Sequence, residues 1–309
     1  MSPWKSRRVR GLLWQVLALG AVLALLGWLA VNTVQNMQAR GIPGGFDFLL
    51  EPAGFDISET LLSWDPDRPY WLAFGNGVLN TLRVALLGCV LATALGALVG
   101  LGRLARHPLL RALCSAYVEL FRNVPVLLQL LVLYLLLAQA LPAIGEARTL
   151  GPLALDKGGL AWRLGEAGDT LFTLSPEFIA VLGGLTLYTA AFIAEVVRAG
   201  VQAVPRGQRE AAAALALGPV ATLRRVVLPQ ALRVIIPPLA NQYLNLTKNS
   251  SLAVAIGYPE LVSIANTAIN QTGRAVECIT VIMGVYLLLS LLTAGLMNRL
   301  NTRAMLREH

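Results

Sequence analysis

Charged side chains are scarce in this sequence of 309 residues: only 14% are charged, whereas 56% are hydrophobic. A soluble domain averages about 25% charged and about 45–50% apolar residues. The imbalance excludes an ordinary soluble domain, whose water-exposed surface needs more charge than this. It predicts a chain dissolved in a bilayer, where apolar side chains face both neighbouring helices and hydrocarbon.

Cysteine and histidine are also rare. The three cysteines, Cys89, Cys114 and Cys278, lie in or beside separate apolar runs, and such a scattered, odd set makes neither a disulfide framework nor a metal-ligand spacing. The two histidines, His107 and His309, lie outside the polar patches of the apolar runs, so no Ser/His/Asp set is credible. We expect no catalytic site and no metal site, and an intramembrane enzyme is therefore a weak alternative.

Lysine occurs three times, as Lys5, Lys157 and Lys248, and none of the three follows the glycine-rich loop of a G-x-x-x-x-G-K-[ST] motif. That motif is the usual device by which backbone N–H groups cradle the phosphates of ATP. We therefore expect the chain itself to bind no cofactor.

The charges that are present alternate in sign along the chain. Acidic residues gather between positions 47 and 67, whereas arginines flank other apolar runs, as in the group Arg103, Arg106 and Arg111. This alternation is typical of the positive-inside rule of membrane proteins. It is not the basic stripe with interleaved aromatics that indicates nucleic-acid binding.

Six apolar runs are long enough to cross a bilayer, which takes about 20 residues in a helix. We expect an all-α membrane protein of about six transmembrane helices, and the predicted ranges are 11–31, 77–102, 113–141, 176–200, 234–257 and 276–298. Both termini are then cytoplasmic. The segments 32–75 and 142–175 are external loops, and a short helix is expected around 58–62.

The predicted organisation is an appendage followed by a core. The appendage is residues 1–75, a transmembrane helix with an acidic external loop, and the core is five helices over 76–300. The core contains an internal segment, 201–233, and a basic cytoplasmic tail, 301–309, follows it.

Several residues are expected to shape these helices. Gly88, Gly96 and Gly100 form a small-residue face for close packing. Arg83, near the outer end of the same helix, is expected to extend its charge to the surface. Because proline lacks an N–H group, Pro125 is expected to bend the third helix near Phe121, and Pro237 and Pro238 to bend the fifth near its start.

The internal segment carries the strongest signal. An alanine-rich run, bracketed by glycines and ending before a Leu-Pro pair, predicts a short water-exposed helix with a smooth, narrow surface. About 30 residues is long for a mere connection. The residues are Gly207, Glu210, Ala211, Ala212, Ala216, Gly218, Leu228 and Pro229.

This pattern resembles the EAA motif of importer permeases in the ABC transporter superfamily. The resemblance implies a type I ABC importer permease fold, with Glu210-Ala211-Ala212 in a coupling helix that docks into a separate ATP-hydrolysing subunit. The family usually has glycine where Ala216 stands, and Gly218 comes two residues later. We expect altered geometry at that helix end rather than lost docking.

Three further runs resemble the polar-amino-acid permeases of that superfamily, and within it the Q-type permeases of general L-amino-acid transporters. They are Glu119 to Pro125 with Gln129, Leu187 to Arg198 with Tyr188 and Glu195, and Leu246 to Leu252 with Asn249 and Ser250. Asn123-Val124 stands where Gly-Thr is more usual. The resemblance implies a multi-pass protein of the bacterial inner membrane.

The same resemblance implies a set of partners. They are a second permease, identical or different, a dimer of ABC ATPases that binds ATP and Mg, a periplasmic amino-acid-binding protein, an amino-acid substrate and membrane lipid.

Buried charge supports a transport path independently. Glu119, Arg122, Glu195 and Lys248 lie inside apolar helices, where a charge costs at least about 2.5–3.5 kcal/mol and usually faces a bundle interior or wet cavity. Glu119 and Arg122, three residues apart, share one helix face and are a candidate pair. Two readings stay open for this pair: it lines the path, or it only holds helices together.

Lys248 lies about 22 Å along its helix from Arg233, at 1.5 Å per residue, which is deep in the membrane. We expect it either to line or gate the path, against an acid such as Glu195, or to make a structural contact between helices. An ion-coupled secondary transporter is the main alternative function. It would explain the buried charges but not the long internal alanine-rich helix.

Overall fold

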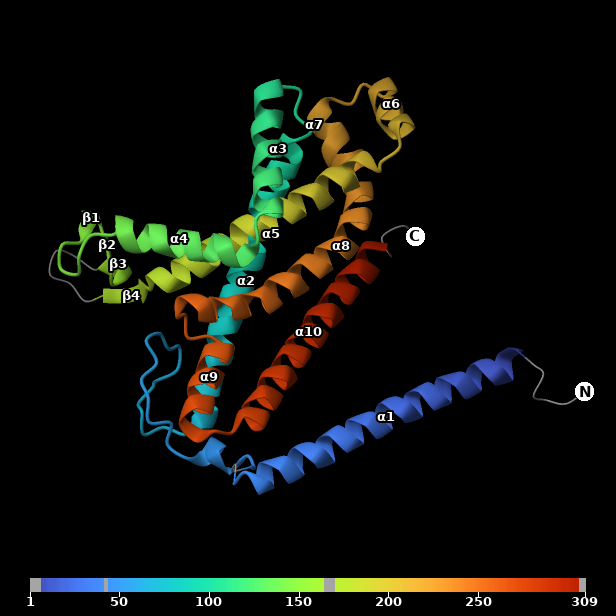
Figure 1. Ribbon diagram of the computed structural model, residues 1–309. Coiled ribbons are helices and arrows are strands. Elements are labelled where there is room, and N and C mark those ends of the chain that lie inside the picture. Colours follow the sequence, from blue (N-terminus) through green and yellow to red (C-terminus); the bar gives the residue numbers. More distant parts are fainter. Residues whose placement is uncertain (1–6, 42–43, 164–169, 306–309) are drawn as a thin grey trace, which may run out of the picture.

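The computed structural model describes residues 7–41, 44–163 and 170–305, and within them the chain is mainly helical (Figure 1). The long helices are α1 (Arg7–Ala39), α2 (Tyr70–Gly102), α5 (Pro176–Gln202), α8 (Leu228–Asn249) and α10 (Ala275–Met305). Shorter ones are α3 (Pro108–Asn123), α4 (Val126–Ala140), α6 (Arg206–Ala214), α7 (Pro219–Thr222) and α9 (Leu261–Thr272). Three short segments complete them: the 3₁₀ turn η2 (Asp47–Leu50), the π-helical η3 (Leu223–Val227) and the 3₁₀ helix η4 (Ser250–Ile256).

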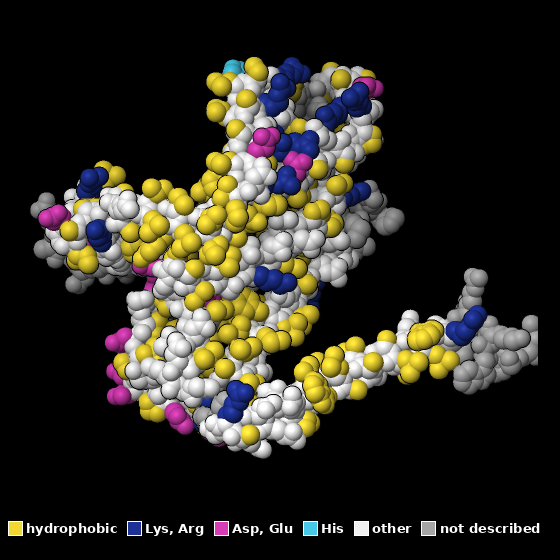
Figure 2. Space-filling view, in the orientation of Figure 1, with side chains coloured by type: hydrophobic (Ala, Val, Ile, Leu, Met, Phe, Trp, Pro, Cys, Tyr) yellow, Lys and Arg dark blue, Asp and Glu magenta, His cyan; other side chains and the backbone are white. Residues whose placement is uncertain are grey.

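Four described helices are long and apolar enough to cross a membrane unbroken: Arg10–Ala39, Tyr70–Gly102, Pro176–Gln202 and Ala275–Arg299. Two bent helix pairs raise the number to as many as six. In the space-filling view, apolar side chains cover the middle of the molecule, and charged ones gather toward its ends (Figure 2). The expected helical membrane architecture is therefore confirmed, with four unbroken candidate crossings and two bent helix pairs as candidate broken ones.

The first broken crossing corrects the prediction of one helix over 113–141. The chain forms α3 and α4, which meet at an angle of 106°. The break lies at Val124–Pro125 rather than near Phe121, and both residues have extended backbone angles. The prediction assumed that Pro125 only bends a helix, but proline also disfavours helical angles in the residue before it.

The second broken crossing corrects the prediction of a helix over 234–257. Helix α8 begins earlier, at Leu228, and continues through Pro237 and Pro238. It runs into η4, and Gly257, with a left-handed φ of 81°, ends that turn. A further helix, α9, was not predicted; the buried Glu260 side chain caps it by accepting hydrogen bonds from the N–H groups of Val262 and Ser263.

Helices α2 and α5 form the centre of the core, and glycine permits their close approach. A Cβ atom on Gly96 would lie 2.7 Å from the Ile193 side chain, and one on Gly100 would lie 2.7 Å from the Ala194 carbonyl oxygen. A Cβ atom on Gly88 would lie 3.2 Å from Leu246 of α8. The predicted small-residue packing face of α2 is confirmed, and it brings the backbones of α2 and α5 almost into contact.

The two segments predicted as external loops are more ordered than expected. Residues 142–175 contain a four-stranded antiparallel sheet in the order β1-β2-β3-β4, which the prediction of a plain loop missed. The strands are β1 (Arg148–Leu150), β2 (Leu153–Asp156), β3 (Gly159–Arg163) and β4 (Thr170–Leu174). Register pairs Leu155 with Leu160 and Ala161 with Thr173.

The first of these segments, residues 44–69, is anchored to the core by aromatic packing. The helix expected around 58–62 is absent from these described residues, and η2 forms instead. Its buried Phe48 ring packs edge-on against Tyr70, at 5.5 Å between centroids, and against Phe74 at 6.5 Å. Because Tyr70 begins α2, the first core helix starts within the 1–75 segment. Helix α1 stands apart and exposed along its length (Figure 1).

Candidate coupling helix and translocation path

The alanine-rich segment forms an exposed helix, α6, at one end of the molecule beside α7 (Figure 1). Ala212 is buried against the body, whereas Glu210 and Ala211 are exposed. The Arg209 guanidinium donates a hydrogen bond of 2.7 Å to the Val201 carbonyl, which ties α6 back to the end of α5. The helix therefore packs one side against the body and exposes the acidic residue of the motif to solvent.

The end of α6 has the geometry of a Schellman motif. The Leu217 N–H donates to the Ala212 carbonyl at 3.0 Å, and the Ala216 N–H donates to the Ala213 carbonyl at 2.9 Å. Ala216 is left-handed, with a φ of 53°, the one non-glycine residue with positive φ in the described chain. Leu215 and Val220, just after α6, are 76% and 79% exposed. The other predicted coupling residues on this surface are also exposed: Gly207, Gly218, Leu228 and Pro229.

A cluster of charges lies where α2, α3 and α5 meet. Glu195 accepts hydrogen bonds from Arg103 of α2 and Arg198 of its own helix. The cluster borders a cavity of about 380 Å³ that is lined by Arg103, Val118, Glu119, Arg122, Asn123, Phe192 and Glu195. A second cavity of about 290 Å³ shares Arg122, Phe192 and Glu195 and reaches Pro238 and Gln242 of α8.

The expected Glu119–Arg122 pair is not formed. The ion pairs of the described residues join Arg83 to Glu59, and Arg103 and Arg198 to Glu195. The Arg122 guanidinium instead lies over the Phe192 ring, 5.1 Å from its centroid, and Tyr188 packs against the same ring at 4.9 Å. Arg122 and Glu119 thus both line the cavity, but no ion pair joins them.

Gln129 provides hydrogen-bond donors for backbone carbonyls at the break between α3 and α4. Its amide N–H₂ group donates to the carbonyls of Phe121, at 2.9 Å, and Val124, at 2.8 Å. These carbonyls would otherwise lack partners, because Pro125 interrupts the helix. Gln129 thus has a structural explanation besides its candidacy as a path residue.

Lys248 lies near the end of α8 with an exposed side chain. The polar residues expected to surround it do not contact it through these hydroxyl groups. The buried Thr247 hydroxyl donates to the Tyr243 carbonyl, and the buried Ser250 hydroxyl donates to the Thr247 carbonyl. Asn249 is half-buried at the junction with η4. Glu195, the suggested partner of Lys248, is occupied by Arg103 and Arg198 in this conformation.

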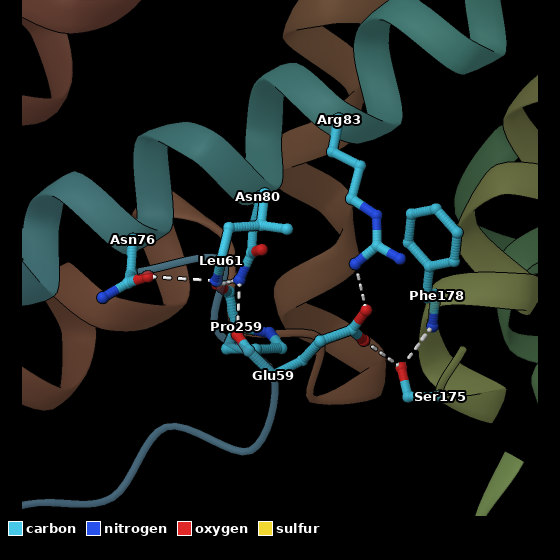
Figure 3. A network of polar contacts seen from close by, with 8 residues as sticks. All are labelled: Glu59, Leu61, Asn76, Asn80, Arg83, Ser175, Phe178 and Pro259. Carbon is cyan, nitrogen blue, oxygen red and sulfur yellow. Dashed lines mark hydrogen bonds and ion pairs between the residues drawn. The ribbon is translucent and has the colours of Figure 1, made fainter. Parts of the chain in front are cut away.

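A polar network that sequence reasoning missed ties residues 44–69 to three parts of the core (Figure 3). Glu59 pairs with Arg83 of α2 and accepts a hydrogen bond of 2.5 Å from Ser175, the residue that caps α5. Asn80 donates to the carbonyls of Glu59 and Pro259, at 2.8 and 2.9 Å.

Two further contacts complete this network. Asn76 accepts hydrogen bonds from the backbone N–H groups of Leu61 and Leu62. The Arg83 guanidinium lies 4.1 Å from the centre of the Phe178 ring. Arg83 therefore does not extend to the surface as expected.

Comparison with known families identifies the chain. Residues 77–307 match the family described as the binding-protein-dependent transport system inner membrane component. The chain belongs to this family. It is thus a multi-pass permease subunit of the inner membrane, in keeping with its apolar helices.

Two relatives whose names describe permeases are similar to this chain over nearly its whole length. YhdX of Escherichia coli (strain K12), whose name describes an amino-acid ABC transporter permease, is 39% identical over 97% of this chain and 95% of its own length. The general L-amino acid transport system permease AapQ of Rhizobium johnstonii is 36% identical over 97% of this chain and 94% of its own.

Solved structures agree with these sequence relatives. A crystal structure of an amino acid ABC transporter with histidines has a TM-score of 0.60 at 27% identity, over 76% of this chain and 95% of that one. The inward-facing methionine transporter MetNI, at 20% identity and a TM-score of 0.58, shares the fold.

Within the permease, the structure brings only some predicted site residues together. Glu119, Arg122 and Glu195 share one cavity wall, with Tyr188 packed behind Phe192. Pro125 and Gln129 lie at the helix break, and Lys248, Asn249 and Ser250 lie at the end of α8. Arg103 was missed as a partner of Glu195, because 92 residues separate the two and no local pattern links them.

Proposed function

We propose that this permease is a membrane subunit of an ATP-driven importer that carries amino acids across the bacterial inner membrane. The named relatives with high coverage support the substrate class, since their names refer to amino-acid permeases and one to general L-amino acids. The permease itself does no chemistry. ATP and Mg belong to a separate ATPase dimer in this proposal.

The observation that carries the proposal is helix α6. It is a short exposed helix between two membrane crossings, with Ala212 buried against the body and Glu210, Ala211, Ala213, Ala214 and Leu215 exposed to solvent. Such a helix fits a groove on a partner protein, because its small side chains allow close approach. Closure of the ATPase dimer on ATP would push α6, and α5 and α8 would transmit the movement.

The charged cavity is the proposed path for substrate. Every amino acid carries a carboxylate, and guanidinium groups bind carboxylates in a bidentate fork. Arg122, with no acidic partner among the described residues, is the candidate for that contact, while Arg103 and Arg198 hold Glu195. Lys248, exposed on α8, is the second candidate path cation, with Asn249 and Ser250 beside it.

The remaining partners follow from the same proposal. A second permease, identical or different, would complete the path, and a periplasmic amino-acid-binding protein would deliver substrate to the side that bears the β-sheet and residues 44–69. Both termini and α6 would then face the cytoplasm.

Reconstitution tests the proposal. The full chain, tagged and purified from its native membrane, is expected to bring an ATPase and a second permease with it. Proteoliposomes of that complex, supplied with the binding protein and a mixture of labelled L-amino acids, should accumulate label when ATP is enclosed. Uptake by the solitary chain on a proton or sodium gradient, without ATP, would contradict the proposal.

A further inference from the structure

A groove of about 820 Å³ runs along the outside of the core, away from the charged cavity. Helices α2 and α10 form its sides, and Tyr243 and Thr247 of α8 form its floor. Exposed Leu86, Val90 and Leu296 line its rim.

The walls of this groove offer apolar surface, because their hydroxyl groups bond to one another or to their own helices. Thr93 contacts the Tyr243 hydroxyl at 2.7 Å and donates to the Cys89 carbonyl at 2.6 Å. Thr247 and Thr293 each donate to the carbonyl four residues earlier, at 2.9 and 2.8 Å. An amino acid, charged at both ends, would find few partners there, whereas a hydrocarbon chain would fit.

The length and end of the groove suit one lipid leaflet. Its lining runs from Leu289 to Arg299 on α10, about 15 Å at 1.5 Å per residue, and half of a bilayer's hydrocarbon core is also about 15 Å thick. Arg299 closes the α10 side of the groove at the end of the crossing Ala275–Arg299. Basic pockets between membrane helices on the cytoplasmic side bind anionic headgroups.

We infer that this groove is a binding site for an anionic phospholipid, with an acyl chain between α2 and α10 and the phosphate on Arg299. The cytoplasmic leaflet follows from the orientation proposed above. Charge argues against α1 as the occupant: with α1 in that orientation, its basic start, Lys5, Arg7, Arg8 and Arg10, would meet Arg299 with like charge.

Native mass spectrometry of the full-length permease in mixed micelles tests the site. Wild-type protein is expected to retain dioleoylphosphatidylglycerol about fivefold better than dioleoylphosphatidylcholine, the preference that one arginine near a membrane surface supplies. Arg299→Gln should remove that preference. Ala94→Phe, which places a ring in the groove, should lower retention of both lipids.

Two matched variants serve as controls. Arg111→Gln removes an exposed arginine of α3, and Ala294→Phe adds a ring to an exposed position of α10 that does not line the groove. Both should retain lipid as the wild type does. Equal retention of the two lipids by the wild type would overturn the inference. So would a disulfide between native Cys89 and the new thiol of Leu23→Cys in α1, or between Cys89 and the new thiol of Leu86→Cys in a second copy.

Discussion

At the scale of single residues, the end of α6 is held by an alanine in a conformation that favours glycine. Ala216 has a φ of 53° and closes the Schellman motif that ends the coupling helix. A left-handed conformation costs a residue with a Cβ atom about 1 kcal/mol relative to glycine. The strained alanine replaces the glycine usual in the family that the sequence resembles, yet the helix end keeps its hydrogen bonds.

Ala216→Gly is therefore expected to stabilise α6 locally by about 1 kcal/mol. Amide hydrogen exchange over residues 206–217 in the purified protein should slow. Ala214→Gly, two residues earlier and inside the helix, is the matched control and should speed exchange, because glycine there costs about 0.5–1 kcal/mol. Faster exchange in Ala216→Gly would refute the assignment of strain.

The Glu59–Arg83 pair is the second residue-scale feature with a measurable consequence. Their side chains are only 10% and 20% exposed, so each charge depends on the other. Removing one partner of a buried pair leaves an uncompensated charge. Glu59→Gln should destabilise the folded protein by up to about 3 kcal/mol, the lower end of the range for such pairs.

The thermal unfolding midpoint in detergent checks this expectation. Asp56→Asn, at an exposed acid of the same segment, should leave the midpoint unchanged. The double variant Glu59→Gln/Arg83→Met should recover part of the loss, since the lone charge is then gone. An additive double variant would show that the two side chains act independently.

At the scale of elements, two candidate crossings of the permease are bent helix pairs rather than continuous helices. Irregular backbone is tolerated at membrane depth only where protein buries it or water reaches it. At the break between α3 and α4, Gln129 donates hydrogen bonds to the free backbone carbonyls. At the start of α9, the carboxylate of Glu260 accepts hydrogen bonds from the first backbone N–H groups. The breaks are thus built features, and the first lies beside the cavity that Arg122 lines.

Helix α6 is the element whose surface the proposed function uses most directly. Glu210→Lys should leave membrane insertion intact but reduce the amount of ATPase that co-purifies and lower uptake. The reason is that the substitution reverses the one acidic charge that α6 presents. Glu146→Lys, the same change at an exposed acid of the loop before the β-sheet, should leave the amount of co-purifying ATPase unchanged. Normal uptake by Glu210→Lys at normal expression would remove the docking role of α6.

At the scale of the whole molecule, charge is distributed between two ends. Arginines of α3, α6 and the end of α10 belong to one end, and the acids of residues 47–67 to the other (Figures 1 and 2). The positive-inside rule assigns the arginine end to the cytoplasm. The exposed and apolar α1 is suited to lipid or to another subunit of the assembly.

Cysteine labelling in spheroplasts tests this orientation. In a chain whose Cys89, Cys114 and Cys278 are replaced by serine, a membrane-impermeant maleimide should label Asp56→Cys in spheroplasts whose inner membrane is intact. It should label Gln208→Cys only after permeabilisation, and both positions are exposed in the structure, so access depends on the membrane alone. Labelling of Gln208→Cys in such intact spheroplasts would invert the proposed topology.

Composition and local pattern missed the break between α3 and α4 and did not predict helix α9. By themselves they determined that this chain crosses a membrane several times and that an alanine-rich helix lies between two crossings. Those features depend on the period, length and apolar character of single segments, which neighbours in sequence decide. The glycine face of α2 was equally readable, because its residues lie four and eight positions apart on one helix.

Only the tertiary structure decided which charged and polar groups lie in contact. Glu59 and Arg83, Arg103 and Glu195, and Asn80 and Pro259 are brought together from positions 24, 92 and 179 residues apart. The expected Glu119–Arg122 and Lys248–Glu195 pairs do not form, because Arg103 and Arg198 hold Glu195 and the side chains of Glu119, Arg122 and Lys248 are exposed. A buried charge takes whichever partner the packing of helices places beside it, and that packing is a property of the whole fold rather than of any one segment.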